Sequence, residues 1–253
     1  MQIRRQLPRL GTRKLYHLLE KDIKAEQLHI GRDKLFEVLR EENLLVKRKR
    51  KYTITTNSKH WMRKYPNLIK QIKLHRPEQL WVADITYIEV QGEHCYLHLV
   101  TDAYSKQIMG YELSESLGAA STVKALKMAL NNRKYPMETL IHHSDRGLQY
   151  CSAEYVRVLN KHQIQISMTE NGDPYENAIA ERINGILKDE FGLGEKLETV
   201  KQARLQLMQS VEAYNQLRPH LSCQMFTPIQ MHKQQTIKLK KWNKKTSNIL
   251  KNV

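Results

Sequence analysis

Three acidic residues stand where carboxylates could do chemistry. Asp84 lies inside the apolar run from Trp81 to Tyr87, and a charge in the middle of such a strand is costly unless it is paired or bound to a cation. Asp145 follows the short apolar segment that ends at His142, and Glu181 stands one turn into a helical pattern. Converging carboxylates of this kind would hold Mg²⁺ or Mn²⁺. Two such ions could clamp the attacking and leaving oxygens of a phosphodiester displacement.

The spacing alone leaves a plainer interpretation open. Taken by itself, Glu181 is better explained as an ordinary solvated helix residue. Asp102 is a fourth candidate acid, but its place at the end of a strand favours a turn cap. The case for chemistry therefore depends on which elements carry these residues.

Those elements form a mixed α/β pattern. Three consecutive strands with short connections, an antiparallel meander, are predicted over 80–90, 95–101 and 107–113. They are followed by a helix (119–133), a strand (140–142), a helix (153–161), a strand (164–166) and two long helices (177–191 and 200–217). This order predicts a mixed sheet with helices on its faces. If the first and fourth strands are neighbours, Asp84 and Asp145 lie side by side, and the helix after the fifth strand can bring Glu181 beside them.

The charge is distributed very unevenly along the 253 residues, whose formal net charge is +16. Residues 1–76 carry 21 basic and 7 acidic residues, residues 77–198 carry 11 and 18, and residues 199–253 carry 10 and 1. Basic arms around an acidic centre suit a polyanion, because neutralising phosphates releases condensed counterions. The plainer alternative is that these lysines and arginines solvate helices and a tail.

The first basic arm contains two short amphipathic helical patterns. One opens at Gly11 with Thr12 as a plausible N-cap, and the other runs from about Gly31 to Glu42. The pair suggests a helix-turn-helix whose second helix, with Arg32 and Lys34 on its outer side, would enter the major groove. The five consecutive basic residues Lys47, Arg48, Lys49, Arg50 and Lys51 would then lie along the DNA backbone.

Composition excludes several other classes. No apolar run approaches the length of a membrane helix, and the first residues are polar rather than an apolar signal core. Cys95, Cys151 and Cys223 are far apart and in no metal-ligand spacing, which makes a disulfide scaffold or a zinc-finger array unlikely. We expect a basic protein of the cytoplasm, associated with the nucleoid.

At this point three segments identify a family. The strand WVADITYI, the segment HSDRGLQY and the segment SMTENGDPYENAIAERINGILKDEF closely resemble the retroviral-integrase-like DDE transposases of bacterial insertion sequences. More narrowly, they are similar to the OrfB product of the IS-three family, as are the helical pair and the segment YNQLRPH. The resemblance covers roughly residues 8–233, and the 35 residues between Asp145 and Glu181 are the family's usual interval.

The resemblance implies a fold and a set of functional residues. The core would be an RNase H-like (integrase catalytic core) mixed sheet with flanking helices, preceded by a small helix-turn-helix domain. Asp84, Asp145 and Glu181 would be the catalytic metal ligands, and Lys188 would contact DNA near the scissile end. Arg146 could reach a phosphate, although a salt bridge to a neighbouring acid is an equal alternative. We expect domain 1–46, a basic linker 47–76, the catalytic core 77–198 and a helix with a basic tail over 199–253.

The expected activity is metal-dependent DNA cleavage at the ends of an insertion sequence, followed by strand transfer from the freed 3′-hydroxyl. Expected partners are DNA (terminal inverted repeats and target), further copies of the chain, and the product of the upstream frame OrfA, with which family members often act as a fusion. Two alternatives remain: a DNA-binding regulator without chemistry, and an RNase H-like nuclease without joining activity.

Overall fold

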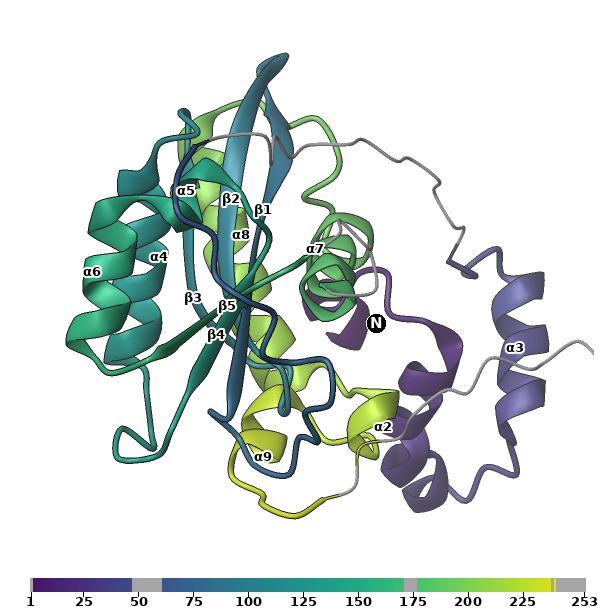
Figure 1. Cartoon of the computed structure of the whole chain (residues 1–253). Coiled ribbons are helices and arrows are strands. Elements are labelled where there is room, and N and C mark those ends of the chain that lie inside the picture. Colours follow the sequence, from purple (N-terminus) through teal and green to yellow (C-terminus); the bar gives the residue numbers. More distant parts are fainter. Residues whose placement is uncertain (1, 47–60, 171–176, 238, 240–253) are drawn as a thin grey trace, which may run out of the picture.

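A five-stranded mixed sheet forms the centre of the molecule (Figure 1). The computed structural model describes residues 2–46, 61–170, 177–237 and 239. The strands stand in the order β3-β2-β1-β4-β5. They comprise β1 (Leu80–Val90), β2 (Glu93–Asp102), β3 (Ile108–Ser114), β4 (Ile141–Ser144) and β5 (Gln165–Met168). The predicted meander and both later strands are therefore confirmed, with bounds shifted by one or two residues.

The pairing of β1 with its two neighbours decides where the acidic residues fall. β1 and β2 form an antiparallel hairpin in which Val90 faces Glu93, and its two-residue turn places both Gln91 and Gly92 at positive φ, as such tight hairpins require. On its other side β1 runs parallel to β4, with Val82 opposite His143. Continuing this register brings Asp84 beside Asp145, as the sequence predicts for neighbouring first and fourth strands.

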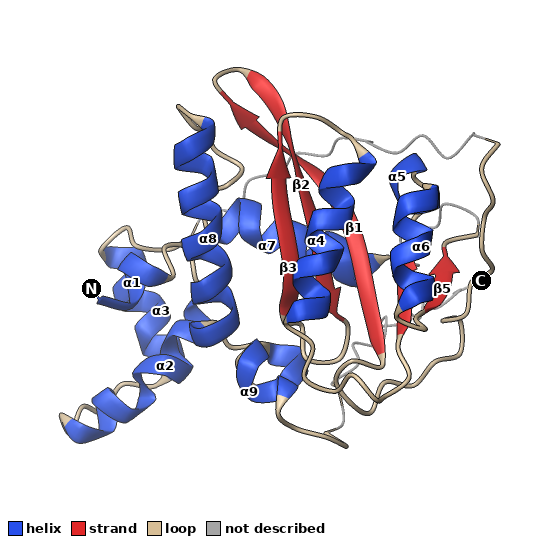
Figure 2. Ribbon diagram, turned by 90° about the vertical axis from the view of Figure 1, so that its left-hand side faces the viewer, coloured by secondary structure: helices blue, strands red, loops and turns tan. Residues whose placement is uncertain are grey.

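Helices cover both faces of the sheet (Figure 2). One face carries α4 (Ala119–Asn131), α5 (Leu148–Cys151) and α6 (Ala153–Lys161), and the other carries α7 (Ala178–Glu190) and α8 (Val200–Leu217). The sheet and α4 approach so closely at Gly110 that an added Cβ would stand 2.1 Å from the carbonyl oxygen of Ala125. The helices on each face bury an apolar cluster of their own against the sheet. Because the strands are covered on both faces, their sequences are nearly continuous apolar runs.

The N-terminal segment contains α1 (Gln2–Gln6), α2 (Thr12–Ala25) and α3 (Arg32–Glu41). The predicted helical pair is present, but the N-cap of α2 is Gly11 and no side chain caps it, so the expectation for Thr12 is wrong. Leu10 and Leu15 belong to the same buried cluster as Leu187 of α7. Whether residues 1–46 form a separate helix-turn-helix domain stays a prediction.

The C-terminal part of the described chain is held by a buried polar network. Asp102 accepts hydrogen bonds from the backbone N–H of Ser105 and of Glu78, each at 2.7 Å, which confirms it as a turn cap. The Glu78 carboxylate in turn pairs with Arg133 and with His232 of α9 (Pro228–His232). Asp102 is therefore engaged in structure at the start of β1, where it lies opposite Trp81. No helix among the described residues is long and apolar enough to cross a membrane.

Candidate active site

Asp84 carries the clearest electrostatic sign of a site. Its pKa is raised to about 7, first by burial and then by the negative charge of Asp145, with a smaller effect from Glu181. Asn184 of α7 donates a hydrogen bond of 2.7 Å from Nδ2 to Asp84 Oδ2. A carboxylate kept in the middle of a strand, close to a second carboxylate, is unfavourable without a cation.

The local chain around Asp145 places its side chain next to that strand. Its Oδ1 accepts a 2.9 Å hydrogen bond from the N–H of Gly147, which turns the chain into α5. A Cβ at Gly147 would lie 3.0 Å from the same Oδ1, so glycine leaves room for the turn. The parallel pairing of β1 with β4 and the turn at Gly147 thus place Asp84 and Asp145 side by side.

Glu181 lies on the first turn of α7 and contributes to the same field, but its side chain is exposed. Desolvation raises its pKa. Within the described part of the chain, no three His, Cys, Asp or Glu side chains stand close enough together to hold a metal ion. The structure thus brings two of the three predicted ligands together and leaves the third at the edge.

Two asparagines of α7 bracket Glu181 and attach the helix to β1, and sequence reasoning missed both. Asn177, at the N-cap of α7, donates from Nδ2 to the carbonyl oxygen of Ala83 at 3.1 Å, and Asn184 reaches the Asp84 carboxylate. Both amide oxygens are buried and have no hydrogen-bond partner among the described groups. The seven-residue spacing, two turns on one helix face, was the available signal.

Positive charge flanks the acidic pair. Burial lowers the pKa of Lys188, and the charges of Asp84 and Asp189 oppose that shift, so the lysine lies beside Asp84. Burial and the Asp145 charge raise the pKa of the Cys151 thiol, whereas Lys64 and Arg146 act in the opposite direction. Arg146 therefore stands on the Asp145 side of the pair.

Two further predicted DNA contacts lie on α3 rather than on the elements that carry the acidic pair. Arg32 and Lys34 project from α3, where Arg32 pairs with Asp33 at 2.8 Å and Lys34 pairs with Glu37 at 3.1 Å. The basic run from Lys47 to Lys51 falls outside the described residues.

The two adjacent histidines of β4 have structural partners. His142 Nε2 is 2.8 Å from the Tyr155 hydroxyl, and His143 Nδ1 is 2.8 Å from the Ser167 hydroxyl. Both rings are buried on opposite faces of β4. They support the strand that ends at Asp145.

The donor atoms at this edge fit a hard divalent cation. Asp84 and Asp145 offer carboxylate oxygens whose mutual repulsion a cation would relieve, and Asn184 Oδ1 is a further buried acceptor without a partner among the described groups. Oxygen-only donors of this kind suit Mg²⁺ or Mn²⁺. Asp84 and Asp145 would hold such an ion, and Glu181 would complete the set from α7.

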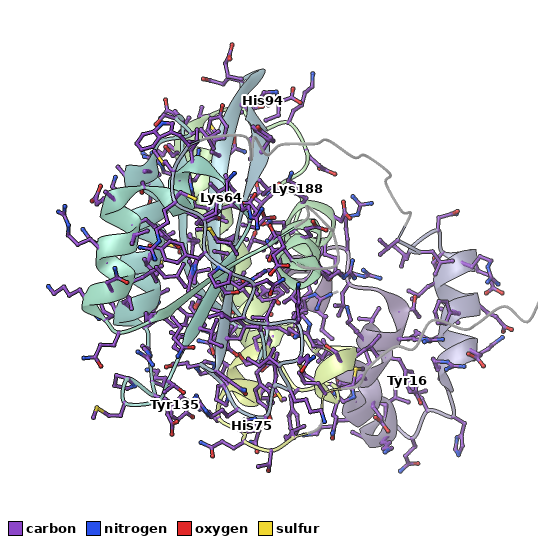
Figure 3. The ribbon with its side chains drawn as sticks, viewed as in Figure 1. Tyr16, Lys64, His75, His94, Tyr135 and Lys188 are labelled. Atoms are coloured by element: carbon purple, nitrogen blue, oxygen red, sulfur yellow. The ribbon has the colours of Figure 1, made fainter. Side chains whose placement is uncertain are left out.

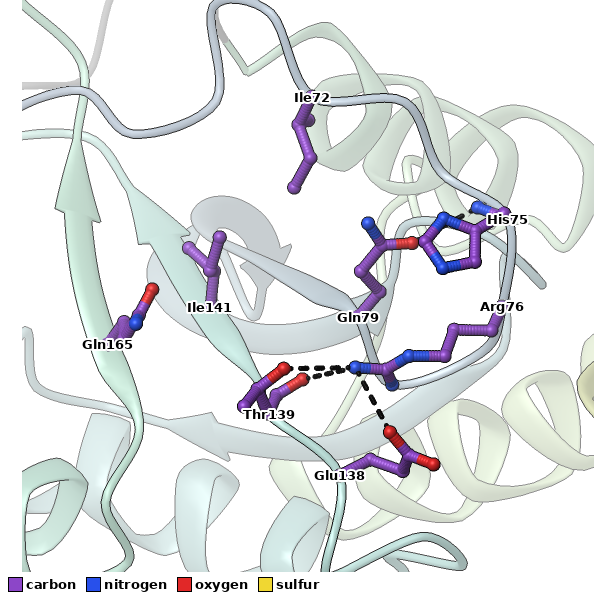
Figure 4. A pocket seen from close by; sticks show the side chains of 8 residues that line it. All are labelled: Ile72, His75, Arg76, Gln79, Glu138, Thr139, Ile141 and Gln165. Atoms are coloured by element: carbon purple, nitrogen blue, oxygen red, sulfur yellow. Dashed lines mark hydrogen bonds and ion pairs between the residues drawn. The ribbon is translucent and has the colours of Figure 1, made fainter.

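A cavity of about 400 Å³ lies at the opposite ends of β4 and β5 and is separate from this site (Figure 4). Ile141 and Gln165, the first residues of the two strands, line it. Arg76 crosses its wall, where it donates to the carbonyl oxygen of Thr139 at 2.7 Å and faces Glu138. Its charged lining groups are thus already paired with each other.

Comparison with known families matches the region that carries the acidic residues. Two family models, both described as "Integrase core domain", match residues 74–174 and residues 162–228. Asp84 and Asp145 fall within the first match and Glu181 within the second. The two matches together span the sheet and the helices α4 to α8.

Two curated relatives are similar over most of this chain. A 31 kDa protein of insertion element IS600 from Shigella sonnei is 39% identical over 181 residues, covering 71% of this chain and 65% of that protein. The "Transposase InsF for insertion sequence IS3A" from Escherichia coli is 34% identical over 194 residues, covering 76% of this chain and 67% of that protein. The chain thus spans about two thirds of the length of these relatives.

The fold is also that of a solved integrase. The catalytic core domain of HTLV-2 integrase, solved in complex with magnesium, matches with a TM-score of 0.50 and 19% identity, covering 62% of this chain and 97% of that domain. The five-stranded mixed sheet and the matches to integrase core domain models place the chain in the class of proteins with an RNase H-like integrase core. Within that class, this chain belongs to the IS3-type insertion-sequence transposases.

Proposed function

We propose that this chain cuts DNA at the ends of its own insertion element and joins the freed 3′-hydroxyl to target DNA, with Asp84, Asp145 and Glu181 as the catalytic carboxylates. The observation that carries this proposal is the repelling pair Asp84 and Asp145, held side by side on parallel strands beside the helix that bears Glu181. Bound divalent ions, two in this proposal, would supply an activated nucleophile and charge neutralisation at the phosphate.

The chain's own residues divide the remaining work. Asn184 orients the Asp84 carboxylate, and Asn177 fixes the start of α7 against β1. Lys188 and Arg146 flank the acids with positive charge, and we assign them to phosphates of the DNA next to the cleaved bond. Arg32 and Lys34 of α3 and the basic run Lys47 to Lys51 would hold DNA farther away.

Partners follow from the same reaction. Joining two element ends to one target requires more than one active site, so we propose that the protein works as a homo-oligomer on the terminal inverted repeats and the target, at the nucleoid. The product of the upstream frame OrfA is the further proposed partner, because it would supply sequence-specific binding.

A nicking assay tests the proposal. Purified protein, Mg²⁺ or Mn²⁺ and a labelled duplex with the element's terminal repeat should give a nick at the repeat's end. Glu181→Gln and Asp145→Asn should reduce its rate at least about a hundred-fold, because several kcal/mol of transition-state stabilisation are lost. Glu154→Gln, an exposed acid in the first turn of α6, is the matched control and should cut normally.

The assay runs with and without the OrfA product. Metal-dependent nicking that survives both substitutions would refute the assignment of the carboxylates. Binding of the repeat without nicking under either condition would favour a regulator instead.

A further inference from the structure

Residues 61–76 form a strap along the open edge of the sheet. In Figure 1 the strap runs in dark blue from the level of α5 to the start of β1. The carbonyl oxygen of Pro66 accepts a 3.3 Å hydrogen bond from Met168 of β5, and the N–H of Leu68 donates to the Ser167 hydroxyl at 2.9 Å. These bonds cover the otherwise unpaired edge of β5.

The two ends of the strap are packed differently. Ile69, Ile72 and Leu74 pack against the apolar cluster at the start of β1. At the other end, Met62 and Tyr65 pack against the cluster that contains Tyr150 and Cys151. The first residues of the strap are therefore held against the same apolar layer as α5, the helix that directly follows the Asp145 turn.

That end presents an exposed indole close in sequence to two cations. Trp61 is 91% exposed, although indole is among the side chains that gain most from burial. Arg63 and Lys64 are also exposed, and the Arg63 guanidinium lies 5.2 Å from the centre of the Tyr65 ring. Aromatic faces next to cations are the combination that binds single-stranded nucleic acid, by base stacking and phosphate contact.

Electrostatics connect the strap to the acidic pair. Lys64 and Arg146 both act on the Cys151 thiol in opposition to Asp145, so the three charges share one neighbourhood. Lys188 lies on the Asp84 side of the same pair. Figure 3 shows Lys64 and Lys188 toward the same end of the molecule, with Tyr135 and His75 at the other end.

The charge of the sequence supports the same surface. Residues 47–76 contain 11 basic residues and no acidic residue, whereas residues 1–46 contain 10 basic and 7 acidic residues. The excess positive charge of the first arm therefore belongs to the segment that leads into the strap and to the strap itself, rather than to α2 and α3.

We propose that Trp61 and Lys64 form a binding surface for an unpaired DNA strand at the acidic site, with Trp61 stacking on a base and Lys64 contacting a phosphate. The surface rests on the proposed function and specifies its substrate: a DNA end whose strands are separated next to the cleaved bond. Lys188 and Lys64 then contact the DNA on the two sides of the acidic pair.

The test compares two labelled DNAs by fluorescence anisotropy: the fully paired terminal repeat and the same repeat with an unpaired overhang at its end. Trp61→Ala should weaken binding of the overhang DNA about ten-fold and leave the paired duplex nearly unchanged. Lys64→Gln should weaken both and flatten the salt dependence. Met137→Ala and Lys161→Gln are matched controls, because Met137 is 96% exposed and Lys161 is an exposed cation at the end of α6.

A second readout follows Trp61 directly. Trp81 is fully buried, so with Trp242→Phe as background the exposed emission belongs to Trp61. Overhang DNA should quench this emission, and paired duplex should not. The surface would be overturned if Trp61→Ala left overhang binding unchanged or weakened binding of both DNAs equally. It would also be overturned if overhang DNA did not quench the Trp61 emission.

These outcomes are distinguishable from failure of the proposed function. Wild-type protein that nicks the repeat while Trp61→Ala binds overhang DNA normally would overturn the surface alone. Wild-type protein that neither binds nor nicks the repeat would overturn both.

Discussion

Replacing Asp84 by asparagine should stabilise the metal-free protein at neutral pH. Burial and then Asp145 raise the pKa of Asp84 from 3.8 to about 7. Each pKa unit corresponds to about 1.4 kcal/mol of differential stability, so holding this carboxylate ionised costs up to about 4 kcal/mol. We take this as an upper limit, because the residue keeps some contact with solvent. Asparagine is nearly isosteric, and its amide oxygen can still accept the hydrogen bond from Asn184.

The sign of the pH dependence follows from linkage. Between about pH 4 and pH 7 the native state binds more protons at Asp84 than the unfolded chain does, so the stability of the wild type falls as the pH rises through this window. The amide of the Asp84→Asn variant does not titrate. The variant and the wild type should therefore be similarly stable near pH 4, and the variant should be more stable by as much as about 4 kcal/mol near pH 8.

The assay is urea unfolding in EDTA at several pH values, followed by far-UV circular dichroism. Asp22→Asn, an exposed acid of α2, is the control and should change stability by less than about 0.5 kcal/mol at any pH. Adding Mg²⁺ should reduce the difference in stability between the Asp84→Asn variant and the wild type, because Mg²⁺ binding stabilises only the native wild type. The stabilisation is about 2.7 kcal/mol at a Mg²⁺ concentration of a hundred times Kd. An Asp84→Asn protein that is no more stable than wild type near pH 8, or a gap that does not vary with pH, would refute this reasoning.

Three further predictions concern other parts of the chain. Burial, followed by the charge of Arg218, lowers the pKa of Lys14 from 10.5 to about 8. The stability of the wild type in urea, relative to that of Lys14→Met, should therefore rise by about 3 kcal/mol as the pH increases from 8 to 10.5. Parallel plots of stability against pH for the two proteins would contradict this prediction. Gly110→Ala places a Cβ 2.1 Å from the carbonyl oxygen of Ala125; separating α4 from the sheet should cost about 3 kcal/mol and lower Tm by about 10 °C in calorimetry, and an unchanged Tm would contradict the close packing. Asn177→Ala removes the bond to Ala83; it should cost only about 1 kcal/mol in urea yet slow single-turnover nicking at least about ten-fold, whereas equal rates would show that α7 needs no such attachment.

The sheet was predictable because its strands are buried on both faces. Continuous apolar runs with turn residues between them located all five strands, and the helix α4 between β3 and β4 makes β4 parallel to β3 and to β1. That β1 and β4 are neighbours was only a condition of the site hypothesis, and the strand order meets it. The short helices α1, α5 and α9 were missed. They have only four or five residues each, too few for a helical period to appear in the sequence.

The sequence predicts the acidic residues of the site but not the asparagines that hold α7 against them. Asp84 is conspicuous because a charge interrupts an apolar strand. The seven-residue spacing of Asn177 and Asn184 indicates only that they share a helix face; that this face reaches β1 depends on how α7 crosses the sheet. The pairing of Arg32 with Asp33 is likewise decided by side-chain placement. Such exposed pairs are weak in water, so DNA phosphates can replace Asp33 and Glu37 as partners of the two α3 cations.

The two amides explain how repelling carboxylates persist in a folded chain. If charge alone positioned α7, the helix would move away from Asp84 and Asp145 whenever no cation was bound. Instead, Asn177 bonds to a backbone oxygen of β1 and Asn184 donates to the Asp84 carboxyl group, and an amide N–H can donate to either protonation state of that group. The position of the helix is thus independent of the charge that the site needs for its ligand. It follows that Asp84→Asn should abolish metal-dependent stabilisation and leave α7 in place, whereas Asn177→Ala should retain the acids and displace the helix. Amide hydrogen exchange of α7 should therefore be unchanged in Asp84→Asn and faster in Asn177→Ala, which separates the effect of the site's charge from that of its geometry.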